Sequence, residues 1–172
     1  MSPKTERHVS LSITLILILG ILATACGTAS HPLAPESVAA DPAASFASET
    51  AFCVAEINRM RASAGLPALA NAERIQAFST EAARVDTQAG VPHTHFRQTN
   101  GGNGTAFAEN TIPWWKISSH GSIRNVIREG LTQMWSQGPG GTHFENMRGN
   151  YSEVGCGVFI ANGEVTVSQD FR

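Results

Sequence analysis

Histidines and one glutamate stand in three short segments of this 172-residue chain, each of them near glycines. His93 and His95 belong to the first segment, Glu109 to the second and His143 to the third. Side chains at i and i+2 of an extended segment face opposite sides, so only one of His93 and His95 readily joins a given site. A histidine from each of two segments plus a carboxylate is the ligand set of many zinc sites. The residues therefore predict either a metal or catalytic site, or hydrogen bonds by which His93 and His143 pin their loops to Glu109.

Three helices are predicted from apolar side chains that recur at helical spacing, over residues 50–64, 72–88 and 122–135. Asn71 is a suitable N-cap for the second helix. Glycines and prolines that follow these segments end the helices. Residues 97–105 are rich in Gly and Asn, which predicts a loop.

Apolar residues alternate along 154–160 and again along 165–171, and Asn162-Gly163 lies between the two runs. This arrangement is the strongest short-range signal of a β-hairpin. A short strand is also expected over residues 105–109. Three helices followed by a terminal antiparallel hairpin predict an α+β domain built in layers.

Trp114 and Trp115 are adjacent in a segment that we expect to be a loop. Neighbouring side chains on an extended chain point apart, so one ring can pack inward while the other stays near the surface. Two interpretations remain open. Either the helix over residues 122–135 covers both rings, or the pair forms a hydrophobic lip for an apolar ligand.

The N-terminus is predicted to be an export signal. Lys4 and Arg7 precede an apolar stretch over residues 9–25, which is marginal for a spanning helix of about 20 apolar residues but suits a signal peptide. Small residues lead directly to Cys26, as in a bacterial lipoprotein cleavage site, so we expect Cys26 to carry lipid and to hold the protein on a membrane. The alternative is an ordinary secretory signal in which Cys26 is incidental.

The chain thus divides into a signal peptide over residues 1–25, a flexible tether over residues 26–48 and one folded domain over residues 49–172. With 12 basic and 14 acidic side chains the formal net charge is −2, which gives no electrostatic reason to expect a nucleic-acid partner, because phosphate binding needs a concentrated basic face. If Cys26 is lipidated, Cys53 and Cys156 remain. In an exported protein they are predicted to form one disulfide, and the alternative is two buried free thiols.

Several short motifs occur in an order that resembles the CAP superfamily, which comprises the cysteine-rich secretory proteins, antigen 5 and the pathogenesis-related proteins of plants. The resemblance covers Cys53 to Phe171. Each motif alone is weak, whereas the ordered set is specific. In chain order the motifs are EINRMR at residues 56–61, GLPAL at 65–69, Ala108-Glu109-Asn110, Trp135, GTHFENM at 141–147 and VGCG at 154–157.

The resemblance implies a three-layer α-β-α sandwich with a central antiparallel sheet, and a cleft lined by two histidines and two acidic residues. Glu109 and His143 match two of these cleft positions. For the first histidine the resemblance favours His93 over His95, because an aromatic residue, Phe96, follows His93 three positions later.

Gln137 stands where the family carries its second acidic residue, which removes a negative charge and weakens the binding of a divalent cation such as zinc. Together with the predicted export signal and the lipid on Cys26, the resemblance implies an exported, membrane-tethered CAP domain that binds a lipid or protein ligand through the cleft without catalysis. The alternative is a metal-dependent hydrolase that uses His93, Glu109 and His143. A purely structural envelope protein is a third class.

Overall fold

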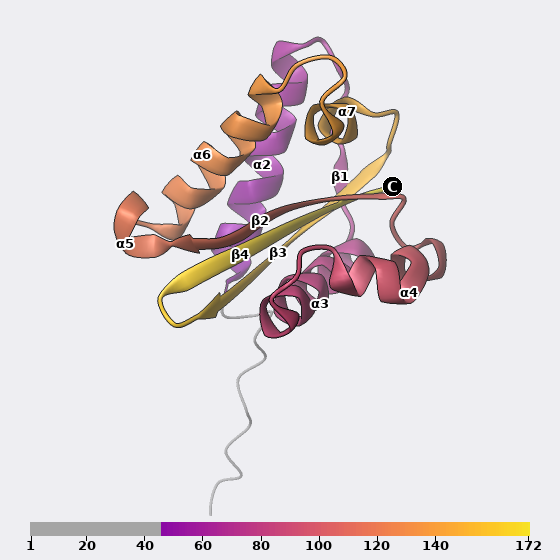
Figure 1. Ribbon diagram of the computed structural model, residues 1–172. Coiled ribbons are helices and arrows are strands. Elements are labelled where there is room, and N and C mark those ends of the chain that lie inside the picture. Colours follow the sequence, from indigo (N-terminus) through magenta and orange to yellow (C-terminus); the bar gives the residue numbers. More distant parts are fainter. Residues whose placement is uncertain (1–45) are drawn as a thin grey trace, which may run out of the picture. The chain divides into compact units, whose positions relative to one another are not determined.

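The computed structural model describes residues 46–172, in which helices surround a central sheet (Figure 1). The predicted signal peptide, Cys26 and most of the predicted tether lie outside the described residues. The helices are α2 (Ala47–Ser63), α3 (Glu73–Ala89), α4 (Thr94–Gly104), α5 (Ile117–His120), α6 (Ile123–Ser136) and α7 (Thr142–Arg148). The strands are β1 (Ala70–Asn71), β2 (Ala108–Lys116), β3 (Glu153–Ala161) and β4 (Glu164–Phe171).

The four strands form one sheet in the order β1-β3-β4-β2. The three long strands pair antiparallel, as predicted, while the two-residue strand β1 pairs parallel with β3. Figure 1 shows α2, α6 and α7 on one side of this sheet and α3 and α4 on the other. The α+β class and the α-β-α layering are therefore confirmed.

The sheet face toward α2 and α6 is apolar. The disulfide between Cys53 of α2 and Cys156 of β3 crosses from helix to sheet on this face, which confirms the predicted pairing. Burial of apolar surface here supplies the main driving force for folding. The fully buried members of this core include Ile57, Ile127, Leu131, Val165, Val167 and Phe171.

The sheet face toward α3 is polar and lies very close to the helix. A Cβ atom on Gly157 would lie 1.9 Å from the backbone oxygen of Ser79, so only glycine allows this approach. The hydroxyl of Thr87 in α3 donates to Thr166 Oγ1 of β4 at 2.7 Å, which fixes the face to which alternate β4 residues point. The buried β4 residues on this face are Thr166, Ser168 and Asp170.

The predicted helices agree with α2, α3 and α6 to within a few residues. Helix α2 begins at Ala47, two residues before the expected start of the folded domain. Ser122 caps α6 by accepting a hydrogen bond from the Asn125 backbone N–H at 3.2 Å. The prediction of Asn71 as the N-cap of α3 is wrong, because Asn71 pairs with β3 and Ala72 occupies the cap position.

Two predicted loops contain regular structure. Helix α4 extends through the Gly- and Asn-rich segment, although residues 100–103 have φ values between 51° and 63°, a left-handed turn that Gly and Asn permit. Strand β2 runs on to Lys116, so Trp114 and Trp115 lie in a strand and not in a loop. A bulge between Ile112 and Trp115 interrupts its pairing with β4.

Within residues 46–172, no helix is long and apolar enough to cross a membrane.

Candidate functional site

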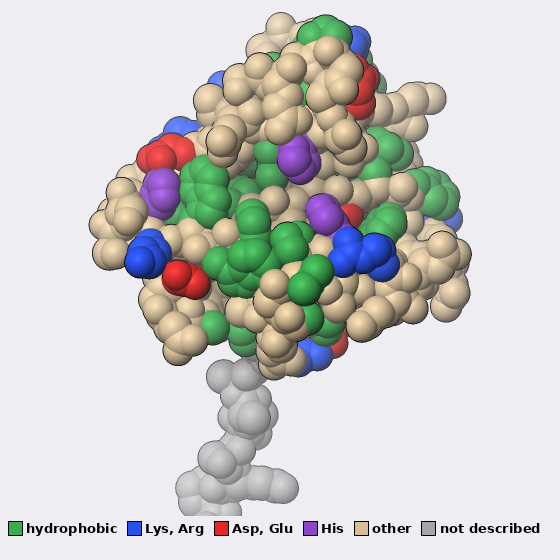
Figure 2. All heavy atoms as spheres, viewed as in Figure 1, with side chains coloured by type: hydrophobic (Ala, Val, Ile, Leu, Met, Phe, Trp, Pro, Cys, Tyr) green, Lys and Arg blue, Asp and Glu red, His purple; other side chains and the backbone are tan. Residues whose placement is uncertain are grey.

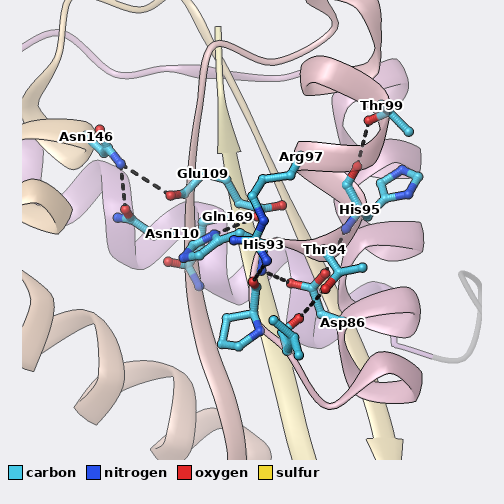
Figure 3. A network of polar contacts seen from close by, with 12 residues as sticks. Asp86, His93, Thr94, His95, Arg97, Thr99, Glu109, Asn110, Asn146 and Gln169 are labelled. Carbon is cyan, nitrogen blue, oxygen red and sulfur yellow. Dashed lines mark hydrogen bonds and ion pairs between the residues drawn. The ribbon is translucent and has the colours of Figure 1, made fainter.

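His93 precedes the first turn of α4 and is held by a carboxylate from the preceding helix. Asp86, which is fully buried in α3, accepts hydrogen bonds from the backbone N–H groups of His93 at 2.6 Å and His95 at 3.0 Å (Figure 3). His93 itself has a φ of 61°, an uncommon conformation for a residue other than glycine. The two bonds to Asp86 therefore stabilise a strained turn and aim the His93 ring at the sheet.

Glu109 of β2 receives that ring. Its Oε1 lies 2.8 Å from His93 Nδ1, and the Glu109 side chain is only 1% exposed. His95 points elsewhere, since its ring packs against Phe78 with centroids 4.8 Å apart. Of the two candidate histidines, His93 is the one that contacts Glu109.

Asn110, the next residue of β2, points to the opposite face and contacts the segment that carries His143. Its Nδ2 donates to the backbone oxygen of His143 at 3.2 Å, and its Oδ1 accepts from Asn146 Nδ2 at 2.9 Å. Asn146 also donates to the backbone oxygen of Glu109 at 3.3 Å. The Glu109-Asn110 pair thus connects one strand to both histidine segments, one on each face of the sheet.

His143 lies in the first turn of the short helix α7, next to Gln137. Gln137 Nε2 lies 2.7 Å from His143 Nδ1. An amide nitrogen can only donate, so Nδ1 accepts and the proton of the neutral ring is on Nε2. Gln137, for which the resemblance predicts the family's second acidic position, therefore sets the tautomer of His143.

Burial controls the charges of these groups. Desolvation lowers the pKa of His93 and of His143, and proximity of His93 lowers the pKa of His143 further. Burial, together with the charge of Asp86, raises the pKa of Glu109 to about 8. Burial also raises the pKa of Asp170, which lies opposite Glu109 in the sheet, well above its usual range. Near neutral pH the site has two uncharged imidazoles above a partly protonated carboxyl pair.

The side chains do not fit the predicted three-residue metal site. Glu109 Oε1 contacts His93 Nδ1, so the glutamate orients the His93 ring. Of the three predicted ligands, this leaves His93 Nε2 and the His143 ring as possible metal ligands. Among residues 46–172, no group of three or more His, Cys, Asp or Glu side chains is arranged to hold a metal ion. We therefore derive no chemistry from a bound metal.

A cavity of about 200 Å³ opens beside His143, between β2 and α6. Figure 2 shows histidine side chains near a hydrophobic patch on one hollowed face of the molecule. Trp115 lines the cavity and packs against the core, whereas Trp114, at a φ of 51° in the bulge, does not line it. The lining residues are Thr111, Ile112, Pro113, Trp115, Gly130, Gln133, Met134, Gln137 and His143.

Sequence reasoning missed three residues that support this site, namely Asp86, Asn146 and Asp170. Asp170 occupies a polar position in an alternating strand, and such a position is ordinarily interpreted as solvent-facing. Asp86 is a polar residue near the end of an amphipathic helix, which carries no distinct signal. Asn146 lies within a quoted motif, and its position three residues after His143 was the available clue.

The sequence matches the family model described as CAP: Cysteine-rich secretory protein family over residues 54–171. No curated protein matches the chain.

Proposed function

Because this chain belongs to the cysteine-rich secretory protein (CAP) family, we propose that its folded domain binds a small hydroxyl-bearing apolar ligand in the cavity beside His143, without catalysing a reaction. The observation that carries the proposal is that a cavity lined by apolar and polar residues opens beside His143, whose pKa is lowered by burial and by the proximity of His93.

The apolar part of the ligand would contact the apolar residues that line the cavity. These include Ile112, Pro113 and Trp115 of β2 and Met134 of α6. A volume of about 200 Å³ is below the roughly 300–1,000 Å³ typical of drug-sized pockets. It therefore suits a short alkyl or cyclic group, or one arm of a larger lipid.

The polar end of the ligand would lie at the histidines. His143 has its proton on Nε2, because Gln137 donates to Nδ1, and so presents a donor. His93 directs Nδ1 at Glu109 Oε1, and with its proton on Nδ1 it would present the Nε2 lone pair to the ligand. A hydroxyl group accepts from one ring and donates to the other, whereas a carboxylate or an ether only accepts.

The alternative of a metal-dependent hydrolase has less support. Glu109 Oε1 contacts His93 Nδ1, and among residues 46–172 no group of three or more His, Cys, Asp or Glu side chains is arranged to hold a metal ion. If His93 acted as a general base without a metal ion, the substrate would have to be held with its reacting atom near His93 Nε2.

The proposal places the domain outside the cytoplasm, tethered to a membrane through a lipid on Cys26. The Cys53–Cys156 disulfide supports an oxidising compartment. Metabolic labelling with a palmitate analogue, compared between the wild-type chain and Cys26→Ser, tests the anchor. Labelling that depends on Cys26 supports it, and an unlabelled wild-type chain in its native host overturns it.

The ligand proposal is tested with 1-octanol as the probe, followed by NMR through the indole N–H signal of Trp115. We expect saturable shifts with 1-octanol, and roughly tenfold weaker binding of 1-methoxyoctane, which cannot donate a hydrogen bond to His93. Gln133→Trp, which places a large ring at the cavity mouth, should abolish the shifts. Thr132→Trp is the matched control, because Thr132 is an exposed α6 neighbour outside the cavity.

Two results would contradict the proposal. One is the absence of saturable shifts at the solubility limit of 1-octanol. The other is equal binding of 1-octanol and 1-methoxyoctane, which would leave the histidines without a part in recognition.

A further inference from the structure

The carboxyl groups of Glu109 and Asp170 meet in the layer between the sheet and α3. The two residues are directly opposite each other in the antiparallel β2–β4 pair, so their side chains share one face and lie side by side. Asp170 has no exposed surface, and Glu109 is nearly as buried. Two carboxylates in contact at such a position cannot both remain ionised without a large energetic cost.

Three of the four oxygens of this carboxyl pair have no hydrogen-bond partner among residues 46–172. They are Glu109 Oε2 and both carboxyl oxygens of Asp170. The Ser79 hydroxyl faces Asp170, but it donates to the backbone oxygen of Ile75 at 3.0 Å. Asp86 is already occupied by the backbone N–H groups of His93 and His95. A proton between the two carboxyls is the available way to satisfy both.

The surroundings indicate which carboxyl carries that proton. Glu109 Oε1 lies 2.8 Å from His93 Nδ1, and an Nδ1–H that donates to Glu109 would stabilise the ionised form of this carboxyl group. Asp170 has no such donor and no solvent contact. The charged and titratable groups that face the pair are Asp86 on α3, and His93 and Arg97 on the α4 segment.

We infer that Asp170 is a positioning residue that keeps its proton at neutral pH and donates it to Glu109 Oε2, so that Glu109 Oε1 holds the Nδ1–H tautomer of His93. The chain Asp170–Glu109–His93 then runs from the buried layer to the cleft. It leaves the Nε2 lone pair of His93 free on the side away from Glu109. The tautomer follows from these contacts alone, and only the use of Nε2 in recognising a hydroxyl rests on the proposed function.

Infrared spectroscopy of the full chain at neutral pH tests where the proton lies. We expect the carbonyl stretch of a buried protonated carboxyl group, which disappears in the isosteric variant Asp170→Asn. Ser168→Ala is the matched control, because Ser168 occupies the same face of β4 and also has no partner among residues 46–172, yet pairs with Thr111 and not with Glu109. An absent band in the wild type, or a band that persists in Asp170→Asn, would overturn the assignment.

Long-range ¹H–¹⁵N NMR of the His93 ring tests the positioning. In the wild type and in Asp170→Asn, whose amide still donates to Glu109, we expect one tautomer with the proton on Nδ1. In Asp170→Ala, which has no donor, the two ring nitrogens should shift toward a mixture of tautomers, and 1-octanol binding should weaken roughly tenfold. A single unchanged tautomer in a folded Asp170→Ala would overturn the positioning role.

The two proposals fail separately. A wild-type His93 tautomer with a free Nε2, together with no binding of 1-octanol, would refute the proposed function and leave the Asp170 inference intact. Binding of 1-octanol that is unaffected in both Asp170 variants, with an unchanged His93 tautomer, would refute the Asp170 inference and leave the proposed function intact.

Discussion

Glu109 differs from an ordinary surface glutamate in what it does to the pH dependence of stability. Burial raises its pKa to about 8, so the folded protein keeps a proton on the Glu109–Asp170 pair that the unfolded chain has already lost near pH 5. When the folded state binds more protons than the unfolded state, stability falls as pH rises. The window for this loss extends from the ordinary glutamate pKa up to about 8.

The two cleft histidines act in the opposite direction. Burial lowers the pKa of His93 and His143, so the unfolded chain takes up protons first as pH falls below the ordinary histidine pKa. Their contribution to stability is therefore complete above about pH 6.5 and is lost as pH falls through their lowered pKa values. Above neutral pH only the carboxyl pair still titrates among these groups.

We therefore predict that the free energy of unfolding of the wild-type chain decreases between about pH 7 and about pH 8, by at most about 1.4 kcal/mol per pH unit for one proton. Glu109→Gln should reduce this slope, because it removes one carboxyl and its repulsion of Asp170. Urea unfolding followed by circular dichroism at fixed ionic strength measures both. A wild-type stability that is flat across this range would show that the pair holds no proton.

At the scale of elements, the packing of α3 on the sheet depends on glycines in β3. Gly157 lies against the backbone of Ser79, and Gly155 lies against the backbone at Ile75 and Gln76. Gln76 fixes the register of the contact, since its side chain exchanges hydrogen bonds with the backbone of Cys156. Close approach brings the polar side chains of α3 within reach of Thr166 and Asp170.

Gly157→Ala should destabilise the domain by about 3 kcal/mol or more, because the new methyl group would overlap a backbone oxygen that cannot move aside. Thermal unfolding measures the effect. Gly163→Ala is the control: its φ is 77°, but nothing lies within 4 Å of an added Cβ, so only the cost of a left-handed alanine, about 1 kcal/mol, is expected. Equal losses in the two variants would show that α3 relaxes away from β3.

The sequence was sufficient for elements with a regular pattern. The helical spacing of α2, α3 and α6 and the Asn162-Gly163 turn are local signals, and the structure contains all of them. Strand β2 was underestimated because Pro113 and the Trp114 bulge break its alternation. Helix α4 was missed because its Gly and Asn residues adopt a left-handed turn that propensities assign to loops.

The candidate site was predictable only in part, for a similar reason. His93, Glu109 and His143 were identified by residue type and motif order. The Asp170–Glu109 contact depends on the strand register, and the Asp86 contact depends on where α3 ends relative to α4. Such relations between distant segments have no local pattern in one sequence.

At the scale of the whole domain, the two faces of the sheet have different roles. The α2 and α6 face holds the apolar core, while the α3 face holds buried polar groups that support His93. Arg61, which is almost fully buried at the end of α2, connects the core layer to α7 by donating to the backbone oxygens of Met147 at 2.8 Å and Gly149 at 3.0 Å. The polar site is therefore supported from both sides by the fold.

The Cys53–Cys156 disulfide determines how much of the chain is free in the unfolded state. The two residues are 103 positions apart, so the crosslink encloses most of the folded domain. In the chain-entropy model a loop of about 100 residues is worth about 4.7 kcal/mol at 25 °C, and measured values are commonly lower. A domain of this size has a total stability of only about 5–15 kcal/mol, so the bond represents a large part of it.

We predict that the double variant Cys53→Ala, Cys156→Ala unfolds at lower denaturant concentration than the wild type, with a loss of about 2–4 kcal/mol, and that reductant has no further effect on it. Reductant should lower the stability of the wild type by a similar amount. Because the bond lies in the apolar face, the paired alanines also leave a small cavity. The double variant Cys53→Val, Cys156→Ala fills part of this cavity. Its comparison with the alanine pair separates the loss of packing from the loss of the crosslink. Mass spectrometry verifies that the bond has been reduced. If the wild-type unfolding midpoint is then the same with and without reductant, the bond contributes nothing to stability, and the apolar core alone holds α2 on the sheet.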